Sequence, residues 1–394
     1  MDSLISDQIL SIFNNTLYFC IRPIVLVLGV ATCSFSAYVF YRMGLNDSVR
    51  VSFFVLCIYD LGFVLMSSVG AVCIILNIGF PQVTSAMTFN PFYVNNISYW
   101  CAGIFYHSSL MTTGFISGVR CCCVAIPFKF RKVFSTKRTA AALLIIFIIS
   151  CSLQLPVVAT QYVSYTREKN NLTKIAILST SNHDITMAVN DILNRNILSW
   201  ITMAVMFISL IVMTAKLKSS VEFRLLATTG HPNTSKLSAI CCCSKYRTEQ
   251  LKSSSQRLFA NLRTQDLDDK IQNDSRIISN SDHREGGSTG KETKSTLENL
   301  RELQLIKSVA LITAMVVALA LPFMVYSLVR RLMPQFNAGN IYGNLFSVIT
   351  TLSAVCAYLN SALNVFIFYC CNTKFKAVAN DIFSCFQNSR SVKQ

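Results

Sequence analysis

Apolar and polar residues follow one another along this chain in long blocks. Seven apolar blocks are each close to the about 20 residues that an α-helix needs to cross a hydrocarbon core of about 30 Å. The third block is the most polar, as expected of a helix that its neighbours shield from lipid. The pattern predicts an all-α membrane protein, a seven-transmembrane helix bundle with spans at Pro23 to Tyr41, Val51 to Ile78, Tyr99 to Val124, Ala140 to Ala159, Ile197 to Met213, Leu305 to Val329 and Ile341 to Cys371.

The segments outside the predicted bundle, residues 23–371, are short except for one loop. Residues 1–22 are expected to form an extracellular N-terminus too small for a folded binding domain, so a ligand must bind the bundle or its loops. The loop 216–303 is rich in Ser, Lys, Asp and Asn, which predicts a mostly disordered cytoplasmic segment. Residues 372–394 begin with apolar side chains at helical spacing, which predicts a short amphipathic helix on the inner leaflet and then a cytoplasmic tail; those side chains are Phe375, Val378, Ala379, Ile382 and Phe383.

Composition and charge agree with a membrane protein. Hydrophobic residues make up 52% of the 394 residues and charged residues 14%, whereas about 25% of an average soluble domain is charged. The net charge of +16 is one-sided, because 28 of the 35 Lys and Arg residues fall in the segments that would be cytosolic if the N-terminus is outside. Positive residues concentrate on the cytosolic side of membrane proteins. We therefore expect a multi-pass plasma-membrane protein with an extracellular N-terminus and no nucleic-acid partner.

The 16 cysteines lie almost entirely in spans or on the predicted cytosolic side, where disulfides are rare. The cluster from Cys121 to Cys123 suits small apolar packing as well as modification. The histidines are not paired at ligand spacing, so metal binding by these cysteines is not expected. Cysteines beside basic residues at the membrane surface are candidates for palmitoylation, namely Cys241, Cys242, Cys243, Cys370, Cys371 and Cys385.

Three glycosylation motifs lie on the predicted outer side, at Asn14, Asn96 and Asn171. The motif is an acceptor for N-linked glycans in exposed segments of secreted chains. It also occurs on the predicted inner side, for example at Asn46 and Asn233. The motif alone therefore does not decide the orientation.

Asp60 is the only acidic residue well inside any predicted span. Burying a charge in a membrane is costly, so such a residue suggests a function by default. Oxygen-bearing side chains on spans three and seven are placed to meet it: Ser109, Asn360, Ser361 and Asn364. Such a cluster is able to hold water or a sodium ion, and the alternative is a polar packing network without an ion.

The order and spacing of several residues resemble the rhodopsin-like (class A) G-protein-coupled receptor pattern, and the resemblance covers all seven spans. The pattern consists of Asp60, then Arg120 followed by Pro127 and Phe128, then Pro322, Asn360 to Asn364 and Phe375. More closely, the run Phe115 to Phe130 is similar to the third-span signature of gastropod mollusc chemosensory receptors, as are Gly44 to Val49 and Asn372 to Phe375.

The resemblance implies roles for residues near the inner face. Arg120 corresponds to the switch arginine, Phe128 to the residue that inserts into a heterotrimeric G protein, and Pro322 to the kink about which span six swings. Glu302 stands where the family often has an acidic partner for that arginine, or it merely begins a charged helix. The candidate residues for coupling and switching are Arg120, Pro127, Phe128, Glu302, Pro322 and Asn364. Receptor kinases, arrestin and membrane lipid are further expected partners.

The sequence also departs from the family pattern, which leaves the detailed activation path open. No cysteine occurs from Thr160 to Asn196, so the usual disulfide to the second outer loop is missing, and Cys101 either pairs with Cys20 or stays free. Residues that replace usual family residues are Cys33, Val119, Ala320, Val365 and Phe368.

The ligand is only weakly specified. A biogenic amine receptor needs an acid where this chain has Ala102, and an opsin needs a lysine where it has Tyr358. Inward aromatic and Met residues are often simple core, yet by position the candidates for a ligand pocket are Ala102, Tyr106, His107, Phe323, Met324, Ser327 and Tyr358.

The function expected is a receptor without enzymatic activity or cofactor. It binds an extracellular small molecule or peptide and activates a G protein, with chemosensation implied by the resemblance and a neuropeptide receptor as the alternative. A seven-span transporter or channel is the rival class, but the spans show no inverted repeat. A membrane hydrolase is disfavoured because nucleophile, base and metal ligands do not converge.

Overall fold

The computed structural model describes residues 6–87, 91–125, 135–167, 173–229, 289–333, 335–337 and 339–391. The chain divides into two compact units, Met1–Lys218 with Glu302–Gln394, and Ser219–Arg301. The predicted helix bundle belongs to the first unit. Much of the predicted cytoplasmic loop, residues 230–288, lies outside the described residues.

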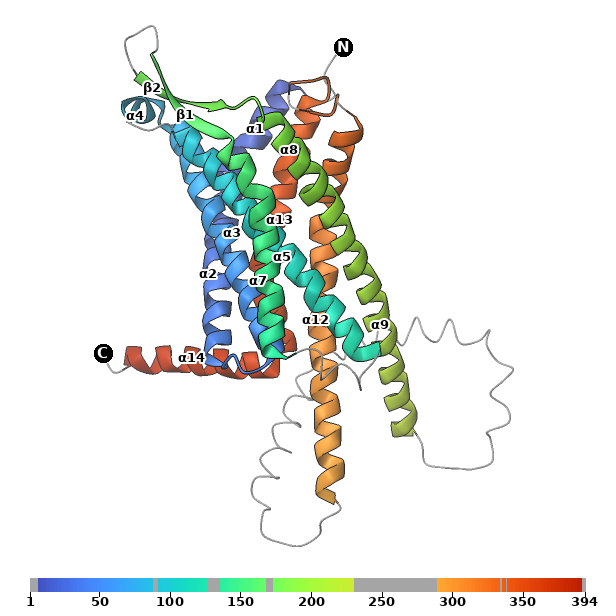
Figure 1. Ribbon diagram of the computed structural model, residues 1–394. Helices are drawn as coiled ribbons and strands as arrows, with labels where there is room; N and C mark the ends of the chain where they lie inside the picture. The colour runs from blue at the N-terminus through green and yellow to red at the C-terminus, as the bar shows by residue number, and fades with distance from the viewer. Residues whose placement is uncertain are drawn as a thin grey trace. The chain divides into compact units, whose positions relative to one another are not determined.

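Helices make up most of the described chain (Figure 1). In chain order they are α1 (Asp7–Thr16), η1 (Leu17–Ile21), α2 (Arg22–Arg42), α3 (Ser48–Gly79), α4 (Pro81–Ala86), α5 (Pro91–Ala125), α7 (Thr136–Ala159), α8 (His183–Asn190), η2 (Asp191–Leu198), α9 (Ser199–Thr229), α12 (Thr289–Leu332), α13 (Gly343–Cys371) and α14 (Thr373–Ser391). Strands β1 (Gln161–Arg167) and β2 (Thr173–Ser179) form an antiparallel hairpin between α7 and α8, which the sequence reasoning did not predict.

The turn between α2 and α3 illustrates how local chemistry sets the helix ends. Gly44 has a φ of 78°, a left-handed conformation that glycine adopts without steric cost. The guanidinium of Arg50 donates to the carbonyl oxygens of Met43 (2.6 Å) and Gly44 (3.1 Å). Asp47 Oδ1 accepts from the backbone N–H of Val49 at 3.4 Å and so caps α3.

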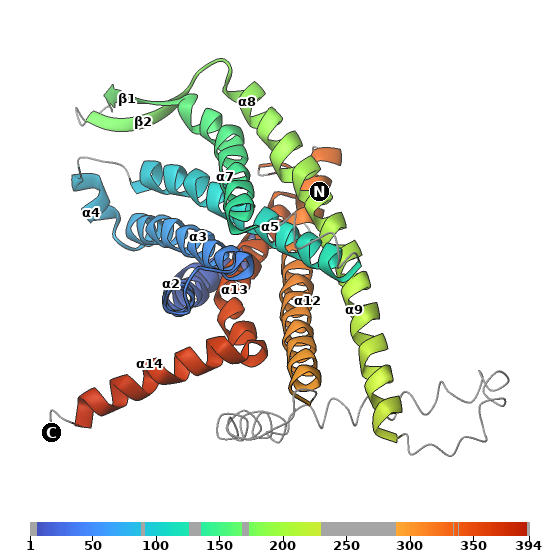
Figure 2. The same cartoon turned by 60° about the horizontal axis from the view of Figure 1, so that its bottom comes forward.

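Six segments of the described chain are long and apolar enough to cross a membrane, namely Asp7–Arg42, Ser48–Gly79, Thr136–Ala159, His183–Ser219, Gln304–Leu332 and Gly343–Cys371. The remaining long helix of the bundle is α5, with 35 residues. Ser108, Thr112 and Ser117 on α5 are 0% exposed, and α5 packs among α3, α7, α9 and α12 (Figures 1 and 2). The predicted all-α bundle with a polar, sheltered third span is confirmed.

Two spans begin earlier in the chain than hydropathy indicated. The first helical segment runs without a break from Asp7 through α2, and the fifth begins at His183 and includes η2. Asn190 and Asn194, both 1% exposed, are buried in this fifth segment. Polar residues that face the interior of the bundle lower the mean hydropathy of a span without ending the helix. The spans predicted from hydropathy therefore began too late in the chain.

An aromatic cluster fixes α14 to the bundle. The ring of Phe40 lies 4.9 Å from that of Phe368 and 5.1 Å from that of Phe375. On α14, Phe375, Ala379 and Ile382 are buried, whereas Phe383 is 53% exposed. The amphipathic helix after span seven is therefore confirmed, and it runs across the ends of the bundle helices (Figure 1).

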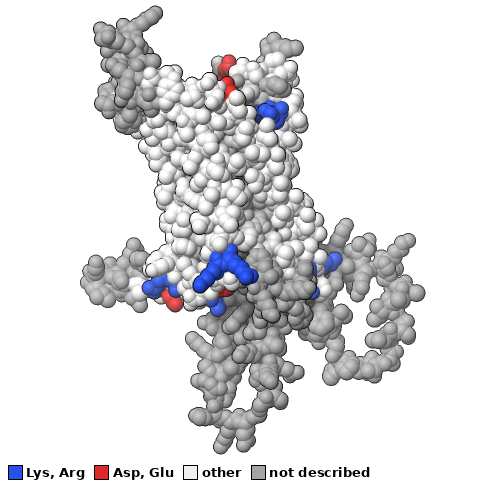
Figure 3. Space-filling view, viewed as in Figure 1, with Lys and Arg blue, Asp and Glu red and all other residues white. Residues whose placement is uncertain are grey.

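Small residues let the helices approach closely. A Cβ added at Gly62 would lie 2.6 Å from the ring of Phe105, and one at Gly114 would lie 2.6 Å from Thr202 Cγ2. Close backbone approach at small residues is typical of helix packing in membranes. The outer surface is apolar: Figure 3 shows a wide band of the described face without charged side chains, between charged ends. The chain is a multi-pass membrane protein.

Candidate functional site

Asp60 on α3 is held by neutral donors from two other helices. Ser109 Oγ on α5 donates to Asp60 Oδ1 at 2.6 Å. From α13, Ser361 Oγ donates to Asp60 Oδ1 at 3.2 Å and Asn364 Nδ2 donates to Asp60 Oδ2 at 2.7 Å. Asp60 is 1% exposed. The structure thus brings together the carboxylate with Ser109, Ser361 and Asn364, and no cation of the described residues is paired with it.

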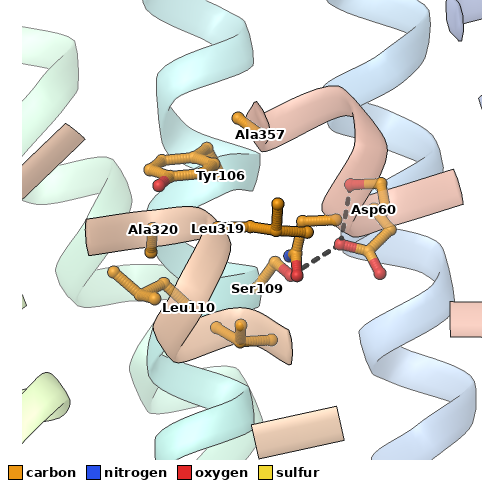
Figure 4. Close-up of a pocket in the computed structure, with 10 residues that line it drawn as sticks. Asp60, Tyr106, Ser109, Leu110, Leu319, Ala320 and Ala357 are labelled. Carbon is orange, nitrogen blue, oxygen red and sulfur yellow. Dashed lines mark hydrogen bonds between the residues drawn. The ribbon is translucent and has the colours of Figure 1, made fainter. Parts of the chain in front are cut away.

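A small cavity adjoins this cluster (Figure 4). The space open to the centre of a water-sized sphere is about 10 Å³, roughly what one water needs. The predicted cluster member Asn360 lines it, and its Oδ1 atom, like that of Asn364, is buried and accepts no hydrogen bond from any described residue. In Figure 4, Asp60 and Ser109 face each other below Tyr106. Unpaired oxygens beside a carboxylate are suited to a hard cation or a water.

Two residues that depart from the family pattern border this site. Cys33 Sγ donates to the carbonyl oxygen of Ser361 at 3.4 Å, and therefore links α2 to α13 at the same level. Ala320 on α12 lines the cavity. Because alanine is small, the room next to Asp60 extends toward α12.

Arg120 lies near the C-terminal end of α5, and its Nη2 atom is buried without a hydrogen-bond partner among the described residues. Nearby along α5, Ser117 Oγ and Thr313 Oγ1 of α12 share a hydrogen bond of 2.5 Å, and both residues are 0% exposed. Pro322 lies inside α12. Pro127, Phe128 and the side chain of Glu302 lie outside the described residues, so the predicted pair of Glu302 with Arg120 stays a prediction.

Four of the predicted ligand-pocket residues belong to a packed group of aromatic rings, namely Tyr106, His107, Phe323 and Tyr358. Tyr106 and Phe323 have ring centroids 5.4 Å apart, and His107 lies 6.2 Å from Phe323. Tyr358 joins this group through Phe63, which stacks at 5.4 Å. The remaining candidates, Ala102, Met324 and Ser327, are buried, at 4%, 0% and 8% exposure.

A second buried charge was not among the predicted site residues. Arg195 on η2 is 9% exposed. Its Nη2 donates to the hydroxyl of Tyr99 at 2.7 Å, and its Nη1 pairs with Asp191 at 3.2 Å. The guanidinium carbon lies 5.5 Å from the ring centre of Phe323. The i, i+4 spacing of Asp191 and Arg195 is the signal in the sequence for an ion pair on one helix face. The predicted fifth span began at Ile197, after both residues, so the pair was not considered part of the bundle.

The candidate modification sites are placed as follows. Asn14 belongs to α1, and Asn96 Nδ2 on α5 donates to Gln161 Oε1 at 2.7 Å. Cys370 and Cys385 are exposed and Cys371 is half-buried. Cys20 and Cys101 are both free, so of the two alternatives for Cys101 the structure has the unpaired one. Asn171, Cys241, Cys242 and Cys243 lie outside the described residues.

Comparison with known proteins identifies the fold. No family model matches the chain, and no curated protein matches it. Among solved structures it is similar to the crystal structure of squid rhodopsin, with a TM-score of 0.56 and 13% identity over 98% of this chain and 88% of the rhodopsin chain. In all, 623 chains of solved structures match, so the likeness identifies a widely shared fold and not one ligand. The chain has the seven-helix fold of rhodopsin.

Proposed function

We propose that the chain is a rhodopsin-like G-protein-coupled receptor, which binds an extracellular chemical cue and activates a heterotrimeric G protein. The observation that carries the proposal is the buried carboxylate of Asp60, bonded to neutral donors from α5 and α13 within a rhodopsin-like fold. A buried acid without a cation is costly in a membrane. Its presence is explained if the contacts between three helices rearrange when the receptor switches.

The switching movement proposed is an outward swing of the inner half of α12. Pro322 interrupts the backbone hydrogen bonds of that helix, which makes it a place to bend. The Ser117–Thr313 hydrogen bond joins α5 to α12 near Arg120 and favours the closed arrangement. A ligand shifts this equilibrium only by its difference in affinity for the two states, and the coupling to the G protein is reciprocal.

The Asp60 cluster also supports a sodium ion as the resident cation. Asp60, Asn360 and Asn364 offer carboxylate and amide oxygens, and the Oδ1 atoms of the two asparagines have no hydrogen-bond partner in the described part of the chain. The ion would supply the positive charge that the carboxylate lacks. Its binding is expected to favour the arrangement in which α3, α5 and α13 are joined through Asp60.

The physiological role we favour is chemosensation in the plasma membrane. It rests on the similarity of the segment Phe115 to Phe130 to mollusc chemosensory receptors, and a neuropeptide receptor of the same class is the alternative. The distribution of Lys and Arg supports an extracellular N-terminus and a cytoplasmic C-terminus. The inner loop and tail are proposed to meet receptor kinases and arrestin.

The proposal is tested in reporter cells that carry promiscuous G proteins. Second-messenger output is measured against chemical and peptide extracts for the parent chain and for Arg120→Ala at equal surface level. A response that Arg120→Ala abolishes supports the receptor, and the active fraction distinguishes a small chemical from a peptide. Ion flux or uptake that survives both the substitution and removal of G protein would instead assign the chain to the transporters or channels.

A further inference from the structure

A continuous row of aromatic rings crosses the outer half of the bundle. Tyr358 stacks on Phe63 at 5.4 Å, Phe63 lies 5.4 Å from Tyr106, and Tyr106 lies 5.4 Å from Phe323. These four residues, here called the aromatic row, come from α13, α3, α5 and α12. Tyr106 also lines the cavity beside Asp60, so the row borders that cavity.

An arginine lies against each end of the aromatic row. The guanidinium carbon of Arg22 is 5.6 Å from the ring centre of Tyr358, and that of Arg195 is 5.5 Å from the ring centre of Phe323. Both distances are within the range of cation–π attraction. Arg22 makes no ion pair with any described residue, and its Nε is buried without a hydrogen-bond partner.

Among the described residues, the acidic partner of Arg195 is Asp191, which also pairs with a second arginine. Asp191 Oδ1 is 3.2 Å from Arg195 Nη1, while Asp191 Oδ2 is 3.7 Å from Nη2 of Arg330. Two arginines therefore share one carboxylate, and in the described part of the chain Arg195 also contacts the uncharged side chains of Tyr99 and Phe323. A buried cation without a full counter-charge is unfavourable unless something else supplies it.

We propose that Arg195 binds the carboxylate of a small organic acid whose apolar or aromatic body packs on the aromatic row. The assignment rests on the proposed receptor function and names the chemical class of its ligand. A planar guanidinium suits a carboxylate because it donates two parallel hydrogen bonds. When the acid binds, Asp191 keeps Arg330 as its partner, so no charge is left alone. Phe323 on α12 and Tyr106 on α5 contact the bound ligand, so its position affects the packing of both helices.

The test measures binding and signalling separately on the full chain. The purified protein in lipid nanodiscs is heated with phenylacetate or octanoate at millimolar concentration, and with the matching neutral amides, phenylacetamide and octanamide. The acids are expected to raise the melting midpoint and the amides to leave it unchanged. The same probes are then applied to the reporter cells, with G-protein output as the readout.

Three variants make the site assignment falsifiable. Arg195→Gln is expected to weaken acid binding by about tenfold or more, which corresponds to about 1.4 kcal/mol. Arg331→Gln removes the same charge from an exposed neighbouring position and should leave binding unchanged. Asp191→Asn removes the competing carboxylate, so acid binding should become stronger, which a merely structural role for Arg195 would not produce. Asp191→Asn also covers the case that Arg195→Gln does not fold.

The outcomes separate the two proposals. Acid-specific stabilisation with no G-protein output supports the anion site and contradicts the receptor function. G-protein output to an extract, with no acid in the panel that stabilises the chain or with amides that act equally, overturns the anion site and leaves the receptor. Weaker acid binding by Asp191→Asn would also overturn it.

Discussion

Among the described residues of this bundle, two charged side chains, those of Asp60 and Arg195, are buried, and their surroundings differ. Asp60 accepts hydrogen bonds from three neutral groups on α5 and α13, and no described cation is paired with it. Arg195 has an acidic partner, but it shares that acid with Arg330 and otherwise contacts aromatic side chains. The comparison indicates that Asp60 joins helices, whereas Arg195 is a cation with capacity for a further anion.

The largest effect is expected from Asp60→Leu. It leaves three buried donors, on Ser109, Ser361 and Asn364, without their acceptor, at a cost of about 1–3 kcal/mol for each. Asp60→Asn keeps an acceptor oxygen and should cost much less. The melting midpoint and the surface level of both variants check this, and a leucine variant as stable as the parent would contradict a joining role for Asp60.

A smaller effect is expected from sodium. If the ion binds at Asp60, a free concentration ten times the dissociation constant adds about 1.4 kcal/mol of stability. The midpoint of the parent should rise in sodium chloride and not in choline chloride of equal ionic strength. Asp60→Asn is the matched control and should lose the difference between the salts. Equal midpoints of the parent in the two salts would leave the cluster as a packing network.

The Ser117–Thr313 hydrogen bond joins α5 and α12 through uncharged side chains, in contrast to Asp60 and Arg195. Thr313→Val removes one hydroxyl from a 2.5 Å contact between α5 and α12, and a hydrogen bond of this kind contributes about 0.5–1.5 kcal/mol. We expect basal G-protein output to rise up to about tenfold. Thr112→Val is the control, because the Thr112 hydroxyl is buried on α5 and has no hydrogen-bond partner among the described residues. An equally large rise for Thr112→Val would contradict the role of the Ser117–Thr313 hydrogen bond in holding the receptor inactive.

The smallest effect on stability is expected from Arg195→Met. The substitution removes the buried cation and keeps an apolar stem, while Asp191 retains Arg330. Because Asp191 keeps a partner, no buried charge is left unpaired, and the main loss is the hydrogen bond from Arg195 to the hydroxyl of Tyr99, so we expect a change of about 1 kcal/mol by denaturation. A loss as large as that of Asp60→Leu would show that the two buried charges are equivalent in the fold.

The same contrast explains what could be predicted from the sequence. Asp60 was found because it is the only acid inside an apolar block, and Ser109, Ser361 and Asn364 follow at positions that face a bundle interior. Arg195 was missed because the outer end of the fifth span is polar, with Asn190 and Asn194 buried in it. The hairpin of β1 and β2 was missed because its strands are short and their pairing, from Arg167 with Thr173 to Gln161 with Ser179, is not registered by a search for apolar blocks long enough to span a membrane.

The receptor assignment is tested most directly by nucleotide exchange on a purified G protein. The full chain is reconstituted in nanodiscs with a panel of heterotrimers, and the rate of GTP-analogue uptake is compared between Thr313→Val and the double variant that adds Arg120→Ala. The account predicts that Thr313→Val accelerates exchange on at least one heterotrimer and that the added Arg120→Ala abolishes the acceleration. Exchange at the spontaneous rate with every heterotrimer, from a variant shown to be folded by its melting transition, would contradict it.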